Sequence, residues 1–189
     1  MNNSVMFCSD LHLGHDNSAH LRGFKTTAEH DHTIISMLQI QCNKRTVLFI
    51  LGDAAMRMES LDFLTNVPGR KKLIRGNHDV FQDGVYRKYF EEVHGFYRYK
   101  HMWLSHCPIH PQEFYSATAN VHGHIHYTAM YKSPPFPYIN LNWDFWERAV
   151  SLDEIKGWVK ARSVPYEHHI NNVASTHENG TPVAMVPRD

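Results

Sequence analysis

Two pairs of side chains that commonly bind metal ions occur in this sequence at a spacing of two residues. Asp10 and His12 form the first pair, and His124 and His126 form the second. Residues two apart in an extended chain point to the same side, so each pair can bind a single ion. The chain contains 16 histidines in 189 residues, an abundance that favours metal binding or acid–base chemistry.

Three more candidates, Asp53, Asn77 and His106, bring the set to two carboxylates, one amide oxygen and four imidazoles. Seven ligands are too many for one ion and suit two, with Asp53 bridging the ions through one oxygen on each. Two ions about 3.5–4 Å apart generate a bridging hydroxide and bind the oxygens of a phosphoryl group during in-line displacement. The set therefore predicts a dimetal centre for phosphoester hydrolysis.

The ligand types restrict both the metal and the substrate. An imidazole-rich set without thiolates suits Mn, Fe, Zn, Ni or Co, whereas Mg and Ca prefer oxygen ligands throughout. Two divalent ions and two carboxylates leave a charge that a hydroxide and a singly charged diester neutralise, while a dianionic monoester exceeds neutrality. We therefore expect two divalent transition-metal ions, manganese first, and a diester substrate.

The strands that position these residues are short apolar runs, each followed by a polar loop. The runs at 5–8, 46–51, 71–75, 102–104 and near 120–121 end at the candidate residues. Further strands are predicted at 96–99 and 138–143, and helices at 27–42, 59–67, 84–93 and from a capping box at Ser151 and Glu154 onward. Alternating strands and helices predict an α/β fold, in which ligands bind at the carboxyl ends of the strands.

The candidate residues belong to five ordered motifs that resemble those of the calcineurin-like metallophosphoesterase superfamily. Across roughly residues 5–145 these are Asp10-x-His12, Gly52-Asp53, Gly76-Asn77-His78-Asp79, His106 and Gly123-His124-x-His126. The extended sequences around His12 and His106 are similar to a small bacterial and phage subgroup of phosphoesterases. The resemblance implies a four-layer α/β sandwich of two facing mixed β-sheets flanked by helices. After Asp53, Ala54-Ala55-Met56 replaces a charged residue of many members, which predicts a more apolar pocket.

The resemblance also implies a role for each motif residue. It assigns Asp10, His12 and His126 to the first metal, Asn77, His106 and His124 to the second, and Asp53 to both. It makes His78 a catalytic residue that stabilises or protonates the leaving oxygen without binding metal, and Asp79 the carboxylate that orients it.

The predicted function is that of a dimetal-dependent phosphoester hydrolase, first a phosphodiesterase acting on a small or nucleotide-like substrate. The alternatives are a phosphomonoesterase, acting on proteins or small molecules, and a non-catalytic scaffold that keeps the fold. Charges balance at 19 Lys and Arg against 19 Asp and Glu, so no extended nucleic-acid surface is expected and a nuclease ranks third. The sequence does not indicate an oligomeric state.

The remaining features concern organisation and location. We expect a metallophosphoesterase domain over residues 1–163 and a polar tail, loosely docked or disordered, over 164–189. Three widely spaced cysteines form no disulfide framework, and no apolar run could span a membrane, so a cytoplasmic protein is expected. Cys107 is predicted to be a buried, inert thiol, because alternation points it away from His106.

The histidines outside the ligand set divide into two groups. His15, His110 and His122 lie near ligands in the sequence and are either ordinary loop histidines or substrate contacts. The others have no supporting context and are predicted to lie on the surface or on helix faces: His20, His30, His32, His94, His101, His168, His169 and His177.

Overall fold

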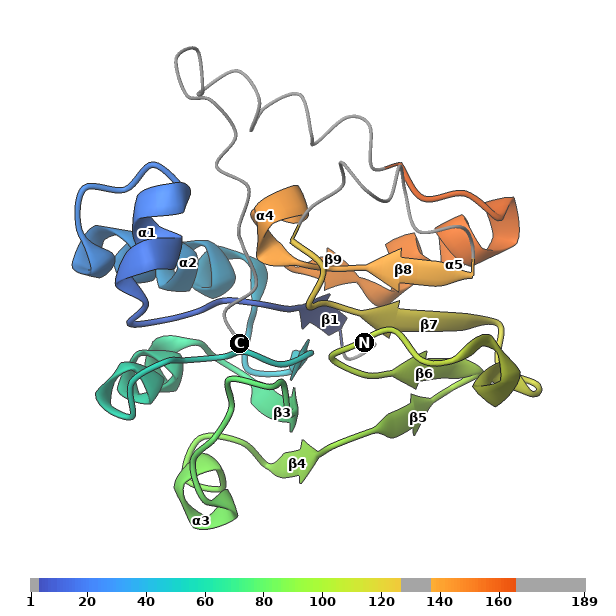
Figure 1. Cartoon of the computed structure of the whole chain (residues 1–189), viewed down its shortest axis with the longest axis horizontal. Helices are drawn as coiled ribbons and strands as arrows, with labels where there is room; N and C mark the ends of the chain where they lie inside the picture. Colours follow the sequence, from blue (N-terminus) through green and yellow to red (C-terminus); the bar gives the residue numbers. More distant parts are fainter. Residues whose placement is uncertain (1–3, 127–136, 166–189) are drawn as a thin grey trace, which may run out of the picture.

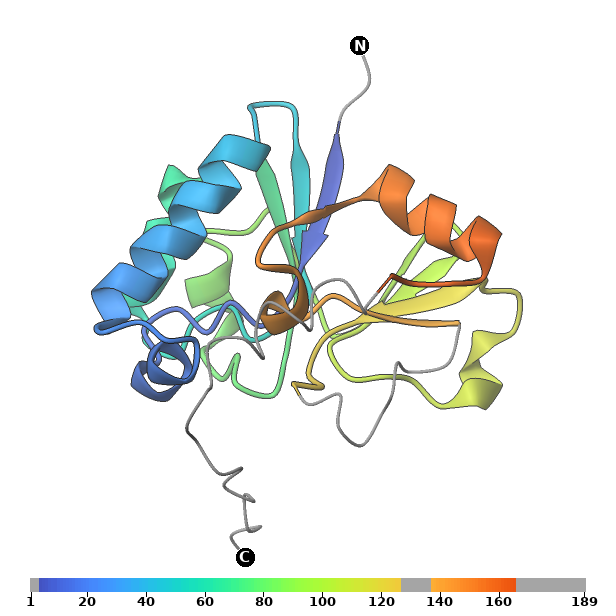
Figure 2. The ribbon, with the colours of Figure 1, turned by 90° about the horizontal axis from the view of Figure 1, so that it is seen from above.

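Two β-sheets face one another in the computed structural model, which describes residues 4–126 and 137–165 (Figures 1 and 2). The first has the strand order β4-β3-β2-β1-β9 and the second the order β5-β6-β7-β8. The α/β architecture of two mixed sheets flanked by helices, predicted from the sequence, is confirmed.

The first sheet holds the parallel strands β1 (Val5–Cys8), β2 (Val47–Ile50), β3 (Arg70–Ile74) and β4 (Glu92–His94). A short strand, β9 (Val150–Ser151), pairs antiparallel with β1 at one edge. β2 is buried at every residue because both faces of the sheet are covered, as its continuous apolar sequence predicts. The carboxyl ends of β1, β2 and β3 therefore open at the same edge.

The second sheet holds β5 (Tyr97–Tyr99), β6 (Met102–Leu104), β7 (Ala119–His122) and β8 (Tyr138–Asn140). β5 runs antiparallel to β6, while β6, β7 and β8 are parallel. Alternate residues such as Leu104, Val121 and Ile139 face the first sheet and pack with Phe7 and Phe49, whose rings stack at 5.2 Å. This apolar layer holds the two sheets together and aligns their carboxyl ends.

Helices cover the far face of the first sheet. The longest, α2 (Thr27–Gln41), is capped by Thr26, whose side chain accepts a hydrogen bond from the Glu29 N–H at 3.1 Å. It packs with η1 (Glu59–Asn66), a 3-10 helix, through Ile34, Leu38 and Leu61 of a second core cluster. The short helices α1 (Asp16–Leu21) and α3 (Asp83–Tyr86) lie on the same side of the sheet (Figure 2).

The chain after β8 joins the edges of the two sheets. α4 (Trp143–Trp146) is a single turn, and α5 (Leu152–Ala161) begins with the predicted capping box, in which Ser151 and Glu154 exchange hydrogen bonds. Trp146 belongs to the core between the sheets, and the partly buried Trp158 stacks on it at 4.7 Å. On the outer face of the second sheet lies η2 (Pro111–Phe114), whose Glu113 carbonyl accepts from the Trp103 ring N–H at 2.9 Å.

Two secondary-structure predictions were wrong. The helix predicted at 84–93 ends at Tyr86, and residues 92–94 form β4, because pairing with β3 satisfies their backbone and Gly84 weakens the helix. The strand predicted at 138–143 ends at Asn140, because the Asn142 side chain accepts from the Asp144 N–H and starts α4. Most of the predicted tail, 164–189, lies outside the described residues, and its character stays a prediction. Within the two described ranges, no helix combines the length and the apolar character that crossing a membrane requires.

Candidate metal centre

All seven predicted ligands follow strands whose carboxyl ends meet between the two sheets. Asp10 and His12 follow β1, Asp53 follows β2, Asn77 follows β3, His106 follows β6, and the last two, His124 and His126, follow β7. Backbone hydrogen bonds tie these loops together, among them Asp10 N–H to Gly52 O at 3.0 Å and His12 N–H to Asp53 O at 2.9 Å. The His124 N–H donates to Asp10 Oδ2 at 3.0 Å and so joins the loops of the two sheets.

Several ligand residues have a strained backbone. Among the described residues other than glycine, eight have a positive φ, and four of them are Asp10 (58°), His12 (51°), Asp53 (52°) and His124 (69°). This conformation is unfavourable for residues with a Cβ and persists where the surroundings enforce it, often at functional sites. At Asp10, His12 and His124 the backbone is held by hydrogen bonds from their N–H groups to Gly52 O, Asp53 O and Asp10 Oδ2.

Two motif glycines allow the loops to approach closely. A Cβ at position 76 would collide with Asp53 Oδ1, and a Cβ at position 123 would collide with Ser9 Oγ and Asp10 Oδ2. Any larger residue at either position would push a carboxylate out of place. Gly76 and Gly123 therefore serve the geometry of the aspartates in the facing loops.

The first group of ligands contains buried polar atoms whose hydrogen-bonding capacity is unfilled. His126 Nε2 lies 3.4 Å from Asp10 Oδ1, and His12 Nε2 lies 3.9 Å from the same oxygen. Asp10 Oδ1 and both ring nitrogens of His12 are buried without a hydrogen-bond partner among the described residues. Leaving such atoms unpaired is costly, whereas a cation would pair with the oxygen and with a ring nitrogen. Asp10, His12 and His126 thus fit a divalent ion.

The pKa of His12 supports the same conclusion. Desolvation by burial lowers it to about 3, against the opposing effects of the Asp10 and Asp53 carboxylates. The ring is therefore neutral at physiological pH, and a neutral imidazole is the form that binds a metal.

The second group lies around the ring of His106. Its Nδ1 donates to the Leu51 carbonyl at 2.8 Å, which directs Nε2 into the site. From Nε2 the distances are 2.9 Å to Asn77 Oδ1, 3.1 Å to His124 Nδ1 and 3.3 Å to Asp53 Oδ2. These four side chains converge as the sequence predicts.

Asp53 lies between the two groups. Its Oδ2 is 3.3 Å from His106 Nε2 and 3.8 Å from His12 Nε2, whereas its Oδ1 accepts from the His78 N–H at 2.9 Å. Desolvation raises the pKa of Asp53, but hydrogen bonding to His106 and further favourable interactions outweigh it and lower the pKa to about 2. A single oxygen of the ionised carboxylate thus faces both groups, whereas the sequence predicted one oxygen toward each.

A partly buried network of polar side chains, which was not predicted from the sequence, supports the first group. His126 Nδ1 donates to Asp144 Oδ2 at 2.7 Å, and Arg22 Nε donates to Asp144 Oδ1 at 2.6 Å. Arg22 also donates to the Asp10 carbonyl at 2.7 Å, so it holds the loop as well as the carboxylate. Burial lowers the pKa of His126, but the neighbouring Asp10 and Asp144 carboxylates raise it to about 9 overall.

The network continues into helix α2. Arg22 Nη1 donates to His30 Nε2 at 2.9 Å, His30 Nδ1 donates to Asp31 Oδ1 at 2.7 Å, and Asp31 Oδ2 accepts from the Gly14 N–H at 2.8 Å. His30 was predicted to lie on the surface or on a helix face, and it lies on the buried face of α2, fully buried. The helical spacing of His30 with the apolar residues Ile34 and Leu38 was the signal that could have placed it on the buried face.

The two predicted catalytic residues differ in their surroundings. His78 is exposed, and its ring centre lies 5.7 Å from that of His12, at the rim of the ligand cluster. Asp79 is buried and accepts from the backbone N–H groups of Asp53, Gly76 and Ala54 at 2.8, 2.8 and 3.1 Å. Its carboxylate therefore fixes the loop that carries Asp53, in place of the predicted contact with the His78 ring.

The three neighbouring histidines occupy different positions. His15 is half-buried, with its ring centre 5.5 Å from that of His12, and its Nδ1 forms a 2.6 Å hydrogen bond with Ser18 Oγ. His110 is exposed and caps η2. His122 is buried at the end of β7, where desolvation lowers its pKa to about 4.

Cys107 was predicted to be a buried, inert thiol, and this prediction was wrong. It is exposed, and its sulfur lies with ring nitrogens of His106 and His124 in a group whose atoms are all within 4.8 Å of one another. Strand alternation was the wrong guide, because β6 ends at Leu104 and residue 107 lies in a loop. The cluster is therefore not free of thiols.

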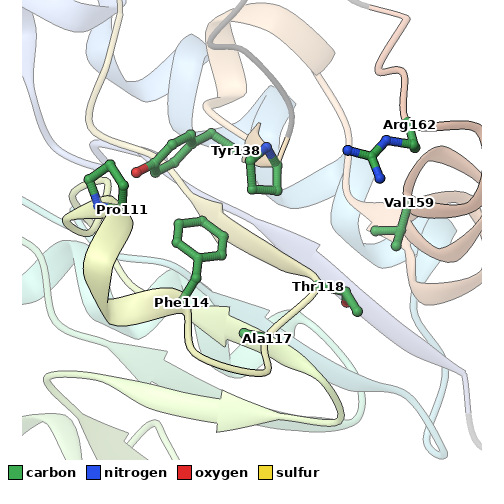
Figure 3. A pocket seen from close by; sticks show the side chains of 8 residues that line it. Pro111, Phe114, Ala117, Thr118, Tyr138, Val159 and Arg162 are labelled. Carbon is green, nitrogen blue, oxygen red and sulfur yellow. The ribbon is translucent and has the colours of Figure 1, made fainter.

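A pocket of about 510 Å³ lies elsewhere, between η2 and α5 (Figure 3). Phe114 and Tyr138 line one side and Val159 and Arg162 of the α5 end line the other. Its lining includes no carboxylate and no imidazole, so it offers none of the metal ligands found between the sheets.

Comparison with known proteins identifies a family of phosphoesterases and two curated relatives. A family model, Calcineurin-like phosphoesterase, matches residues 4–182. Two curated relatives are both named Gene 66 protein: that of Mycobacterium phage D29 is 40% identical over 81 residues and that of Mycobacterium phage L5 is 34% identical over 82 residues. Each match covers 40% of this chain and 40% of the relative, so the chain spans about two fifths of the length of these proteins.

A solved structure matches over more of the chain. The protein of unknown function AQ665 from Aquifex aeolicus is 26% identical, with a TM-score of 0.67 over 82% of this chain and 99% of that one. The family match and the cluster of aspartates and histidines together indicate divalent metal binding.

Proposed function

The chain belongs to the calcineurin-like phosphoesterase family, and from this membership we propose that it hydrolyses a small or nucleotide-like phosphodiester with two divalent transition-metal ions. The observation that carries the proposal is the pair of ligand groups that share Asp53 Oδ2. Asp10, His12 and His126 would hold one ion, and Asn77, His106 and His124 would hold the other. Ions bound there would activate water for attack on phosphorus and neutralise charge on the phosphoryl oxygens.

The charges around the cluster favour a diester. The guanidinium of Arg22 is occupied by Asp144 and by the Asp10 and Leu11 carbonyls, and that of Arg75 by Asp83 and by the Asp79 and Phe81 carbonyls. Neither arginine is directed at the ligand cluster to balance the extra charge of a monoester. The two carboxylates and two ions therefore suit a singly charged substrate.

His78 is proposed to act on the leaving group. Its backbone N–H is anchored to Asp53 Oδ1 at 2.9 Å, which places an exposed imidazole next to the ligand cluster. An imidazole at this rim can donate a proton to the departing oxygen, or a hydrogen bond to the charge that develops on it. Asp79 serves this step indirectly, because it holds the backbone of Asp53 and Gly76 on either side.

A direct comparison of two substrates tests the proposal. Metal-stripped protein is assayed with an aryl phosphodiester and with the matching monoester, each with and without Mn²⁺. We expect turnover of the diester that requires the ion, and its loss in Asp53→Asn. Preference for the monoester would replace the proposal with a phosphomonoesterase, and bound ions without turnover of either ester would favour a scaffold. Asp16→Asn, which changes an exposed carboxylate paired with Arg57, is the matched control.

A further inference from the structure

Cys107 lies at the open side of the second ligand group. The thiol is exposed, and its sulfur lies within 4.8 Å of one ring nitrogen of His106 and one ring nitrogen of His124. The adjoining group, Asp10, Asp53 and His106, shares His106 with it, and one carboxylate oxygen of its Asp10, Oδ1, is buried without a hydrogen-bond partner among the described residues. The sulfur and an unsatisfied carboxylate oxygen therefore belong to groups that meet at one imidazole.

The loop that carries Cys107 is fixed at its backbone. Ser105 Oγ donates to the Cys107 carbonyl at 2.6 Å and accepts from Asn120 Nδ2 at 2.9 Å, which ties the loop to β7. The His106 carbonyl accepts from the Gly123 N–H at 2.9 Å, so the loops of His106 and His124 are also joined. Residue 107 therefore keeps its place beside both histidines, and its side chain is exposed.

We propose that Cys107 contributes a thiolate ligand to the second metal ion, beside His106 and His124. The inference rests on the proposed dimetal function and adds a ligand to it. Zn–N and Zn–S bonds are about 2.0 and 2.3 Å, so a nitrogen and a sulfur that bind one ion are about 3–3.5 Å apart. From a group within 4.8 Å, the sulfur reaches such a position by a shift of at most about 2 Å.

The ligand changes which ions this position selects. Thiolates favour zinc and other thiophilic transition metals over manganese, and binding releases the thiol proton to solvent. The second position is thus specified for a softer ion than the first, whose ligands are a carboxylate and two imidazoles.

Cobalt provides a spectroscopic test that is independent of turnover. Metal-stripped, reduced full-length chain is titrated with Co²⁺ in the absence of oxygen, and the near-ultraviolet thiolate-to-cobalt charge-transfer band is recorded together with the visible cobalt absorption. We expect the band in the parent protein and in Cys42→Ala, which removes a buried thiol at the end of α2. We expect its loss in Cys107→Ala, with the visible cobalt absorption retained.

The outcomes separate this inference from the proposed function. Bound cobalt without a charge-transfer band in the parent, or a band that persists in Cys107→Ala, would overturn the role of Cys107 and leave the dimetal centre intact. Failure of the parent to bind cobalt would overturn the metal centre itself, and the inference with it.

Discussion

Replacing Asp144 with Asn tests how the ring of His126 is held for metal binding. Asp144 accepts from His126 Nδ1 at 2.7 Å and from Arg22 Nε at 2.6 Å. Asn has one acceptor oxygen and one donor amide, so it can satisfy just one of these donors. With the oxygen toward Arg22, the amide faces His126 Nδ1 and favours the tautomer that carries its proton on Nε2. That nitrogen faces Asp10 and is the one that would bind the ion.

The expected loss is about 10- to 100-fold in affinity for the first ion, or roughly 1.4–2.7 kcal/mol, the usual effect of disturbing the carboxylate that orients a metal-binding histidine. Two observations favour the upper part of this range. The hydrogen bond is short and charged, and the Asp144 side chain is 24% exposed, so water replaces the lost acceptor poorly. Folding should survive, because Arg22 keeps its bonds to the Asp10 and Leu11 carbonyls.

Metal affinity is measured by competition with a chromophoric chelator, for the parent, Asp144→Asn and the control Asp16→Asn. Asp16 pairs with Arg57 at 2.8 Å, but both side chains are more than half exposed, so we expect the control to match the parent within about twofold. Urea unfolding checks that each variant is folded. An affinity of folded Asp144→Asn equal to that of the parent would refute the orienting role of Asp144.

Three further predictions concern Asp53, His78 and His122. Asp53→Asn should lower the affinity for both ions together in a metal titration. If the affinity of one site were unchanged, Asp53 would not be a ligand shared by both ions. His78→Ala should keep both ions in a metal analysis and lose about 10²–10⁴-fold in turnover, and activity equal to the parent would remove His78 from the reaction. Burial lowers the pKa of His122 to about 4, so the folded protein loses stability as pH falls from 6.5 toward 4. In His122→Gln, urea unfolding of metal-free protein should show a decrease from pH 7 to pH 4.5 that is roughly 2 kcal/mol smaller, and an equal decrease would contradict this.

Much of the candidate site was predictable because its residues follow apolar runs directly. Asp10 and Asp53 each come after a run that forms a buried parallel strand, and parallel strands deliver such residues to one edge. The supporting residues were not predictable in this way. Arg22 and Asp144 are 122 positions apart, and they meet only because the chain after β8 returns to the first sheet. Cys107 was misplaced because strand alternation does not continue into a loop.

The Asp53 oxygens show a second limit of sequence reasoning. Two carboxylate oxygens and two expected ions suggested one oxygen for each ion, but the His78 N–H occupies Oδ1 and leaves Oδ2 toward both groups. A backbone N–H carries no signature in the sequence, so its competition for a ligand oxygen becomes visible only in the fold. Backbone conformation likewise carries no signature in the sequence, so the positive φ values of four ligand residues become visible only in the fold.

The central claim is that two ions shared by Asp53 carry out diester hydrolysis. The most direct measurement is a titration of metal-stripped protein with Mn²⁺, in which bound ion per chain and turnover of an aryl phosphodiester are determined in the same samples. The account predicts that turnover rises with metal loading and reaches its plateau at two ions per chain. Full turnover in the metal-stripped protein or at one ion per chain, or no turnover at two, would contradict it.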